Sequence, residues 1–192
     1  MLLKLPTIAA ESFGNTGNRS GRRMSVNTGF VYLRPLNVVA VRATGPYEHS
    51  AAQAWSKVFD WLRRTGLIRQ IGTGYGLLLD DPRQVAPDKC RYEACVELIE
   101  EARLLVPESF TIRRLPGGAY VRQRHVGGTP GLAQAISNLR NDWVPNRELA
   151  VDVRRPVIEI YLDNPDHVPE ERQRIDICMP ISAIETSGQS AA

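Results

Sequence analysis

The sequence predicts an α+β fold in which two duplicated βαββ units form one antiparallel sheet with two helices on one face. Two observations predict it. The 192-residue chain repeats its own pattern at an offset of 82 to 83 residues. Each repeat also contains β-branched runs and one stretch whose apolar residues are spaced three and four apart. Strands and helix in each unit must bury their apolar faces together, so one sheet with two covering helices is the simplest packing.

The repeat rests on four blocks that align in the same order with a single one-residue slip. The aligned blocks are residues 41–45 with 123–127, 60–62 with 142–144, 76–82 with 159–165, and 91–96 with 174–179. We therefore expect one domain over residues 29–185, with repeat one at about 29–105 and repeat two at about 106–183.

The elements follow in the same order in both repeats. In repeat one we expect a strand within 30–43, a helix over 49–64 that ends at Gly66, and strands at 75–80 and 90–99. In repeat two the corresponding segments are a strand within 110–126, a helix over 130–143, and strands at 155–163 and 173–181.

The two ends of the chain differ from this domain in composition. Residues 1–34 hold five basic residues and one acidic residue, against 19 basic and 20 acidic in the remainder. Segment 10–27 is rich in Gly, Ser, Asn and Arg, which predicts a disordered basic leader over 1–28, with Met24 as an alternative start, and a disordered tail over 186–192. The nearly neutral body lacks the basic face of a nucleic-acid-binding domain, so no direct nucleic-acid contact is expected.

The remaining composition argues against cofactors, metals and membranes. The three cysteines, at 90, 95 and 178, have no CxxC spacing, and the three histidines have no ligand spacing, so we expect neither a metal site nor a disulfide framework. No apolar run approaches the roughly 18 residues of a membrane span. A cytoplasmic protein without a cofactor is expected.

Glu159 is the candidate centre of a small-molecule site. Side chains alternate along a strand, so Glu159 shares one face of segment 155–163 with Tyr161, and Ile158 and Ile160 share the other. We expect the isoleucine face to pack on the helices and Glu159 to look into the opposite side. The aligned position in repeat one is Gly76, so the strand itself needs no carboxylate there.

Aromatic residues near the same face can wall such a pocket. They are Tyr161, Trp143, Tyr47 and Tyr120. Aromatic rings attract positive charge by about 0.5 to 2 kcal/mol, and a desolvated carboxylate adds to this attraction, so a cationic or polarised apolar ligand is expected. Burial also raises the pKa of a carboxyl, which suits a general acid or base.

Several motifs together resemble the GyrI-like small-molecule-binding domain, the effector-binding domain of AraC-type and MerR-type multidrug regulators, here in a free-standing form. The resemblance covers about residues 30–183 and is carried by residues 45–48, 80–82, 89–93, 116–120, Trp143, 155–162 and 179–181. It implies a cleft between the repeats, Glu159 as the ligand-facing carboxylate, and Tyr161, Trp143 and Tyr47 as aromatic walls. Leu78 stands where relatives often carry an aromatic residue, and Cys178 departs similarly, which implies a roomier and less cation-selective pocket.

Three functions remain open at this point. The first is a sensor or sequestering protein that binds a bulky hydrophobic or cationic compound and confers drug resistance. The second is a hydrolase of a strained electrophilic toxin, in which Glu159 is the catalytic acid-base residue; no second catalytic group stands at an obvious spacing, so we lean away from an enzyme. The third is an inhibitor that binds DNA gyrase through its surface.

Overall fold

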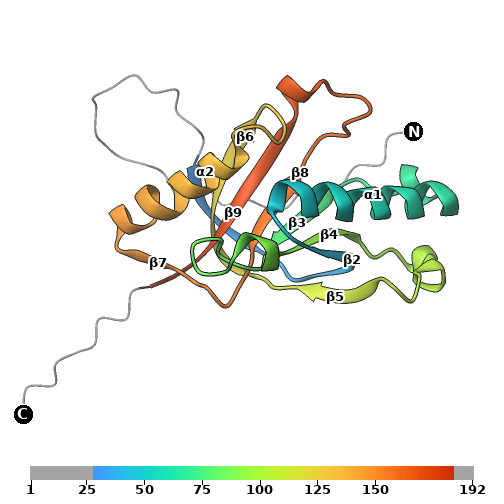
Figure 1. Ribbon diagram of the computed structural model, residues 1–192, viewed down its shortest axis with the longest axis horizontal. Helices are drawn as coiled ribbons and strands as arrows, with labels where there is room; N and C mark the ends of the chain where they lie inside the picture. Colours follow the sequence, from blue (N-terminus) through green and yellow to red (C-terminus); the bar gives the residue numbers. More distant parts are fainter. Residues whose placement is uncertain (1–27, 184–192) are drawn as a thin grey trace, which may run out of the picture.

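The computed structural model describes residues 28–183, which form an α+β fold built on a large antiparallel sheet, as predicted. The expected tail and all of the expected leader except Thr28 lie outside these residues. The sheet has nine strands among the described residues, in the order β1-β6-β9-β8-β3-β4-β2-β5, with β7 paired to β9 alone. Figure 1 shows the two main helices, α1 and α2, on the same side of this sheet.

The elements of the first half are β1 (Thr28–Leu33), β2 (Leu36–Thr44), α1 (Tyr47–Thr65), β3 (Gly74–Leu78) and β4 (Arg91–Glu97), with short 3₁₀ turns at Leu67–Arg69, Pro87–Lys89 and Glu100–Leu105. Those of the second half are β5 (Thr111–Leu115), β6 (Gly118–Val126), α2 (Leu132–Asn138), a π-helical turn (Leu139–Trp143), β7 (Leu149–Val151), β8 (Val157–Tyr161) and β9 (Arg174–Ala183), with 3₁₀ turns at Pro145–Arg147 and Glu170–Arg172.

The first strand of each half is in fact two strands, where the sequence predicted one. Each predicted strand breaks at a proline, Pro35 or Pro116, which lacks the N–H that a continuous ladder needs. The two parts then separate: β1 pairs with β6 of the other half, and β5 pairs with β2. The two turns pack tightly, since a Cβ on Gly117 would lie 2.6 Å from Cδ of Pro35. Each half therefore supplies an edge strand to the other.

The two halves meet at β3 and β8, in the middle of the sheet. These strands are antiparallel neighbours, and Gly76 is the direct partner of Glu159. Each half also contains an equivalent set of hydrogen bonds between an arginine and an aspartate. Arg91 binds Asp80 through its backbone N–H (2.8 Å) and guanidinium, and Arg174 binds Asp163 in the same way (2.7 Å). The duplication stays an interpretation, and these repeated bonds agree with it.

Helix α1 covers the first half of the sheet through one apolar stripe. Its buried residues are Ser50, Ala54, Val58, Trp61 and Leu62, which recur at helical spacing. The helix ends where Gly66 adopts a left-handed conformation (φ 75°) and donates its N–H to the carbonyl of Arg63. Helix α2 and the π-helical turn bury Leu132, Ile136 and Leu139 in the same apolar cluster. Both helices thus pack on one face.

The two faces of β8 are the reverse of the prediction. Val157 and Tyr161 pack with the helix-side cluster, whereas Ile158 and Ile160 belong to a second cluster on the opposite face. Glu159, which alternates with Ile158 and Ile160, therefore faces the helices. The prediction failed because β8 is a central strand buried on both faces, so hydrophobicity does not distinguish the helix side from the other side.

Within residues 28–183, no helix has both the length and the apolar character needed to cross a membrane.

Candidate functional site

Glu159 lies in the middle of β8 with only 4% of its surface exposed. Its Oε2 accepts two hydrogen bonds, one from the hydroxyl of Tyr92 (3.0 Å) and one from the hydroxyl of Tyr161 (2.8 Å). The two hydroxyls are also within hydrogen-bond distance of each other, at 3.2 Å. A buried carboxylate is thus held by two neutral donors.

Glycines on β3 provide the space for this arrangement. A Cβ on Gly76 would lie 2.1 Å from the Tyr92 hydroxyl oxygen and 2.6 Å from Oε2 of Glu159. Tyr92 comes from β4, which pairs with β3 on the side away from β8. Its side chain therefore reaches across β3 to Glu159, and only a glycine at position 76 lets it pass.

Helix α1 closes one side of the site with Trp55. The indole Nε1–H donates to the Tyr92 hydroxyl (3.1 Å), and the ring packs edge-on against Tyr161 at a centroid distance of 5.2 Å. The same indole occupies the space above Gly74, where a Cβ would lie 2.5 Å from Cη2. A chain of hydrogen bonds thus runs from Trp55 through Tyr92 to Glu159.

Burial sets the electrostatics of Glu159. Loss of hydration raises the pKa of the Glu159 carboxyl, and the hydrogen bonds from Tyr161 and Tyr92 oppose that rise. Burial likewise raises the pKa of both tyrosines well above the usual value, so they remain neutral donors. No lysine, arginine or histidine of the described chain forms an ion pair with Glu159.

The second oxygen of Glu159 retains access to solvent. Oε1 accepts no hydrogen bond from residues 28–183. Yet no fully buried side-chain oxygen or nitrogen in this part of the chain lacks a partner. Oε1 must therefore account for part of the small exposed area of Glu159. The described residues thus leave the hydrogen-bonding capacity of Oε1 unused.

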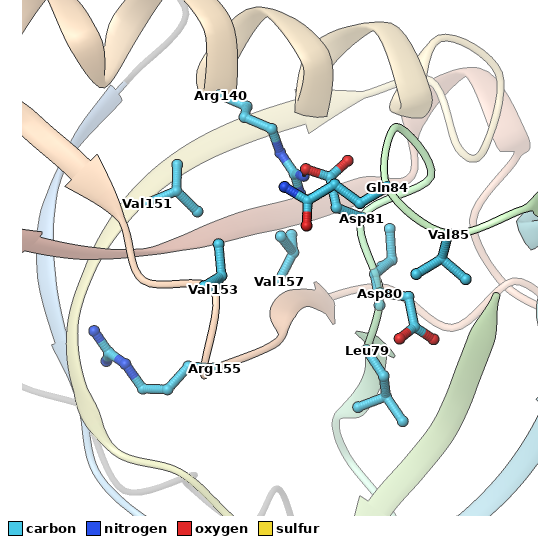
Figure 2. A pocket seen from close by; sticks show the side chains of 11 residues that line it. Leu79, Asp80, Asp81, Gln84, Val85, Arg140, Val151, Val153, Arg155 and Val157 are labelled. Carbon is cyan, nitrogen blue, oxygen red and sulfur yellow. The ribbon is translucent and has the colours of Figure 1, made fainter.

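A pocket of about 150 Å³ lies where β3 ends and β8 begins, and Figure 2 shows the side chains that line it. Its floor is formed by Leu78 and Val157, which are paired neighbours just beyond the Gly76–Glu159 pair. The rest of its lining is Leu79, Asp80, Asp81, Gln84, Val85, Arg140, Val151, Val153 and Arg155. Two residues of a strand span about 7 Å, so this pocket adjoins the Glu159 site.

The structure places four of the predicted site residues, Glu159 among them, at the Glu159 site or the adjoining pocket. Tyr161 contacts Glu159 directly, and Leu78 lies in the pocket floor. Tyr47 packs on Tyr92 with ring centroids 6.3 Å apart, while its hydroxyl donates to the carbonyl of Asp80 (2.6 Å) and accepts from the Asp80 N–H (3.1 Å).

The other two predicted aromatic residues lie elsewhere. Trp143 packs against Phe30 of the edge strand β1, at a centroid distance of 5.6 Å, and lies beneath the guanidinium of Arg147. Tyr120 is buried in the cluster on the face away from the helices, so the sheet separates it from Glu159. In this structure neither residue lines the pocket or contacts Glu159.

Sequence reasoning did not single out Tyr92 or Trp55. The run Gly74-Tyr75-Gly76 was an available signal, because two glycines on one face of a strand leave space for large side chains from neighbouring elements. Which side chains fill that space depends on strand order, and the order β8-β3-β4 follows only from the structure. The described residues contain no group of three or more potential metal ligands.

Comparison with known proteins shows the family of this chain and the structures that share its fold. The GyrI-like small molecule binding domain matches residues 27–182. A protein of Cronobacter turicensis named as a DNA gyrase inhibitor is 29% identical over 160 residues, covering 79% of this chain and 92% of that protein. The EcmrR C-terminal domain superposes with a TM-score of 0.67 at 14% identity, over 84% of this chain and all of that domain. SAV2435 bound to tetraphenylphosphonium superposes with a TM-score of 0.54 at 16% identity, over 83% of this chain and 96% of SAV2435.

Proposed function

Because the chain belongs to the GyrI-like small molecule binding domain family, we propose that it binds a bulky hydrophobic cation on the helix-covered face of its sheet, against Glu159. In this role it acts as a sensor or as a sequestering protein that lowers the free concentration of a toxic compound. Binding alone suffices for either role, and no chemical step is required of Glu159.

The observation that carries this proposal is a buried carboxylate without a protein cation. Burying a charge is costly unless an opposite charge accompanies it. Glu159 has two tyrosine hydroxyls on Oε2 and solvent access at Oε1. A ligand cation at Oε1 completes the charge balance that the protein leaves open.

The rings around Glu159 suit the same class of ligand. Tyr92, Tyr161 and Trp55 surround the carboxylate with aromatic surface, which attracts cations and removes apolar groups from water. SAV2435, which shares the fold, binds tetraphenylphosphonium, a cation of this kind.

The ligand must displace side chains as it binds. Pockets for drug-sized ligands enclose roughly 300–1,000 Å³, whereas the space beside Glu159 measures about 150 Å³. Trp55 is half-buried on α1 and held by one hydrogen bond and ring contacts. Rotation of Trp55 away from Gly74 would enlarge the site without moving the sheet.

Two probes of the same shape and opposite charge test the proposal. We expect tetraphenylphosphonium to bind at least about tenfold more tightly than tetraphenylborate by isothermal titration calorimetry, since a nearby carboxylate contributes at least ~1.4 kcal/mol of preference. Glu159→Gln should reduce this preference to within about threefold. Glu97→Gln, which removes an exposed carboxylate from β4, is the matched control and should leave it intact. A preference that survives in Glu159→Gln would refute the proposal.

A second candidate function follows from the Cronobacter turicensis relative, which is named as a DNA gyrase inhibitor. In this alternative the chain acts on gyrase through its surface, and the carboxylate pocket is not needed. A DNA supercoiling assay separates the two: equal inhibition by the wild type and Glu159→Gln supports the surface mechanism, and no inhibition by the wild type excludes it.

A further inference from the structure

The pocket beside Glu159 contains a second charged group, of opposite sign, that has hydrogen-bonding capacity to spare. Four charged residues line this pocket: Asp80, Asp81, Arg140 and Arg155. Whether each is already engaged by its own protein partners decides what the pocket can bind.

In three of these residues, every polar side-chain atom already has a hydrogen-bond partner on the protein. The Asp80 carboxylate accepts three hydrogen bonds from Arg91, at 2.7 to 2.9 Å. The Asp81 carboxylate accepts bonds from the backbone and guanidinium of Arg83, the shortest at 2.6 Å. These bonds, together with the charge of Arg140, lower the pKa of Asp81 to about 2, so it remains ionised.

Arg155 is also held in place by the protein. Its guanidinium donates to the carboxylate of Asp152 (2.9 Å) and to the carbonyls of Ile181 (2.8 Å) and Gly117 (3.4 Å). Each of its three nitrogens therefore has a partner on the protein.

Arg140 differs. Its side chain is only 11% exposed, and Nη1 forms an ion pair with Asp81. Among the residues that the structure describes, Nε and Nη2 of Arg140 have no hydrogen-bond partner. Since no fully buried side-chain nitrogen there lacks a partner, these N–H groups have access to solvent. Figure 2 shows Arg140 reaching from the second half of the chain toward Asp81 and Gln84 at the pocket.

The local charge balance is also positive. Asp81 is shared by two arginines, Arg83 and Arg140, so this side of the pocket carries one excess positive charge. Arg140 lies in the π-helical turn Leu139–Trp143, and such turns frequently occur at functional sites.

We propose that Arg140 binds a carboxylate or carbonyl oxygen of the ligand, with the apolar part of that ligand against Val151, Val153 and Val157. The inference deepens the proposed function. It assigns the ligand a basic group for Glu159 and an acceptor group for Arg140, on either side of an apolar body, rather than a positive charge alone.

Three small probes of similar size test the Arg140 site apart from Glu159: benzoate, benzamide and benzylammonium. The methyl NMR signals of Val151, Val153 and Val157 report binding at the Arg140 site, and there we expect benzoate to bind most tightly and benzylammonium most weakly. Arg140→Met should weaken benzoate binding about tenfold, the size of one charge-assisted hydrogen bond. Arg140→Lys keeps the charge but loses the planar donors, so its affinity for benzoate should lie between those of the wild type and Arg140→Met.

The controls separate this inference from the proposed function. Arg147→Met removes a nearby arginine that lies on Trp143, outside the pocket, and should leave benzoate binding unchanged. Asp81 keeps its bonds to Arg83 in Arg140→Met, so this variant is expected to fold, and unchanged methyl signals elsewhere verify it. Equal benzoate binding by Arg140→Met and wild type, or no shift at the three valines, overturns the inference even if tetraphenylphosphonium binding depends on Glu159.

Discussion

Buried carboxylates have different partners on the two faces of the sheet. On the face away from the helices, Glu93 is paired with Arg42 (2.7 Å) and Arg113 (2.5 Å), and Asp176 is paired with Arg124 and Arg122. On the helix face, Glu159 is just as buried but has only tyrosine hydroxyls as partners. The exposed fractions of the three residues are 3%, 3% and 4%.

This difference separates carboxylates that are paired within the fold from the one that we propose binds a ligand. An arginine pair offsets the cost of burying a carboxylate, and removal of either partner then destabilises the protein. An unpaired buried carboxylate makes the folded state less stable than a neutral side chain would. A buried, unpaired carboxylate beside a pocket is a candidate for ligand binding or catalysis.

The largest expected effect is on the arginine-paired face. Glu93→Gln should lower the free energy of unfolding by about 2–4 kcal/mol, because Arg42 and Arg113 lose their shared carboxylate. Urea denaturation at pH 7 measures this loss. A change below about 0.5 kcal/mol would contradict the contrast between the two faces, since Glu93 would then contribute no more to stability than an exposed residue.

Glu159→Gln is the matched variant on the helix face, and its effect on the free energy of unfolding should have the opposite sign. The folded-state pKa of Glu159 is raised, so ionisation costs stability as pH rises through that pKa. The glutamine variant should therefore be at least as stable as the wild type at pH 7. The difference should disappear below the unfolded pKa of about 4.3, where both side chains are neutral.

A smaller effect is expected at the glycine opposite Glu159. Gly76→Ala should destabilise the protein by about 1–3 kcal/mol, because the new Cβ collides with Tyr92 and Glu159. Gly29→Ala, on β1, has nothing within 4 Å of its Cβ and is the control. The double variant Gly76→Ala with Tyr92→Phe should recover part of the loss, since the closest contact, 2.1 Å, is with the Tyr92 hydroxyl. No recovery would mean that Tyr92 does not occupy this space.

The sequence was sufficient to predict the α+β class and to single out Glu159. Both came from local signals, namely strand and helix periodicity and the contrast between Glu159 and Gly76 at aligned positions. The breaks at Pro35 and Pro116 were not predicted, although a proline interrupts a strand ladder. The exchange of β1 and β5 between the halves depends on pairing between segments far apart in the chain.

The rest of the site depends on tertiary structure. The face of β8 that carries Glu159 was predicted to point away from the helices, because a strand buried on both faces has apolar residues on both. Tyr92 and Arg140 join the site only through strand order and through the approach of the π-helical turn to the loop at Asp81. Trp143 and Tyr120 were chosen for their chemistry, and the fold places them elsewhere.

The titration of Glu159 itself tests the central claim most directly. Carbon-13 NMR of its side-chain carboxyl, with and without saturating tetraphenylphosphonium, gives its pKa in both states. The account predicts a pKa above the ordinary value of about 4.3 in the free protein, and a lower pKa when the cation is bound, since a nearby positive charge favours the carboxylate. An ordinary or lowered pKa in the free protein, or one that the bound cation leaves unchanged, would contradict it.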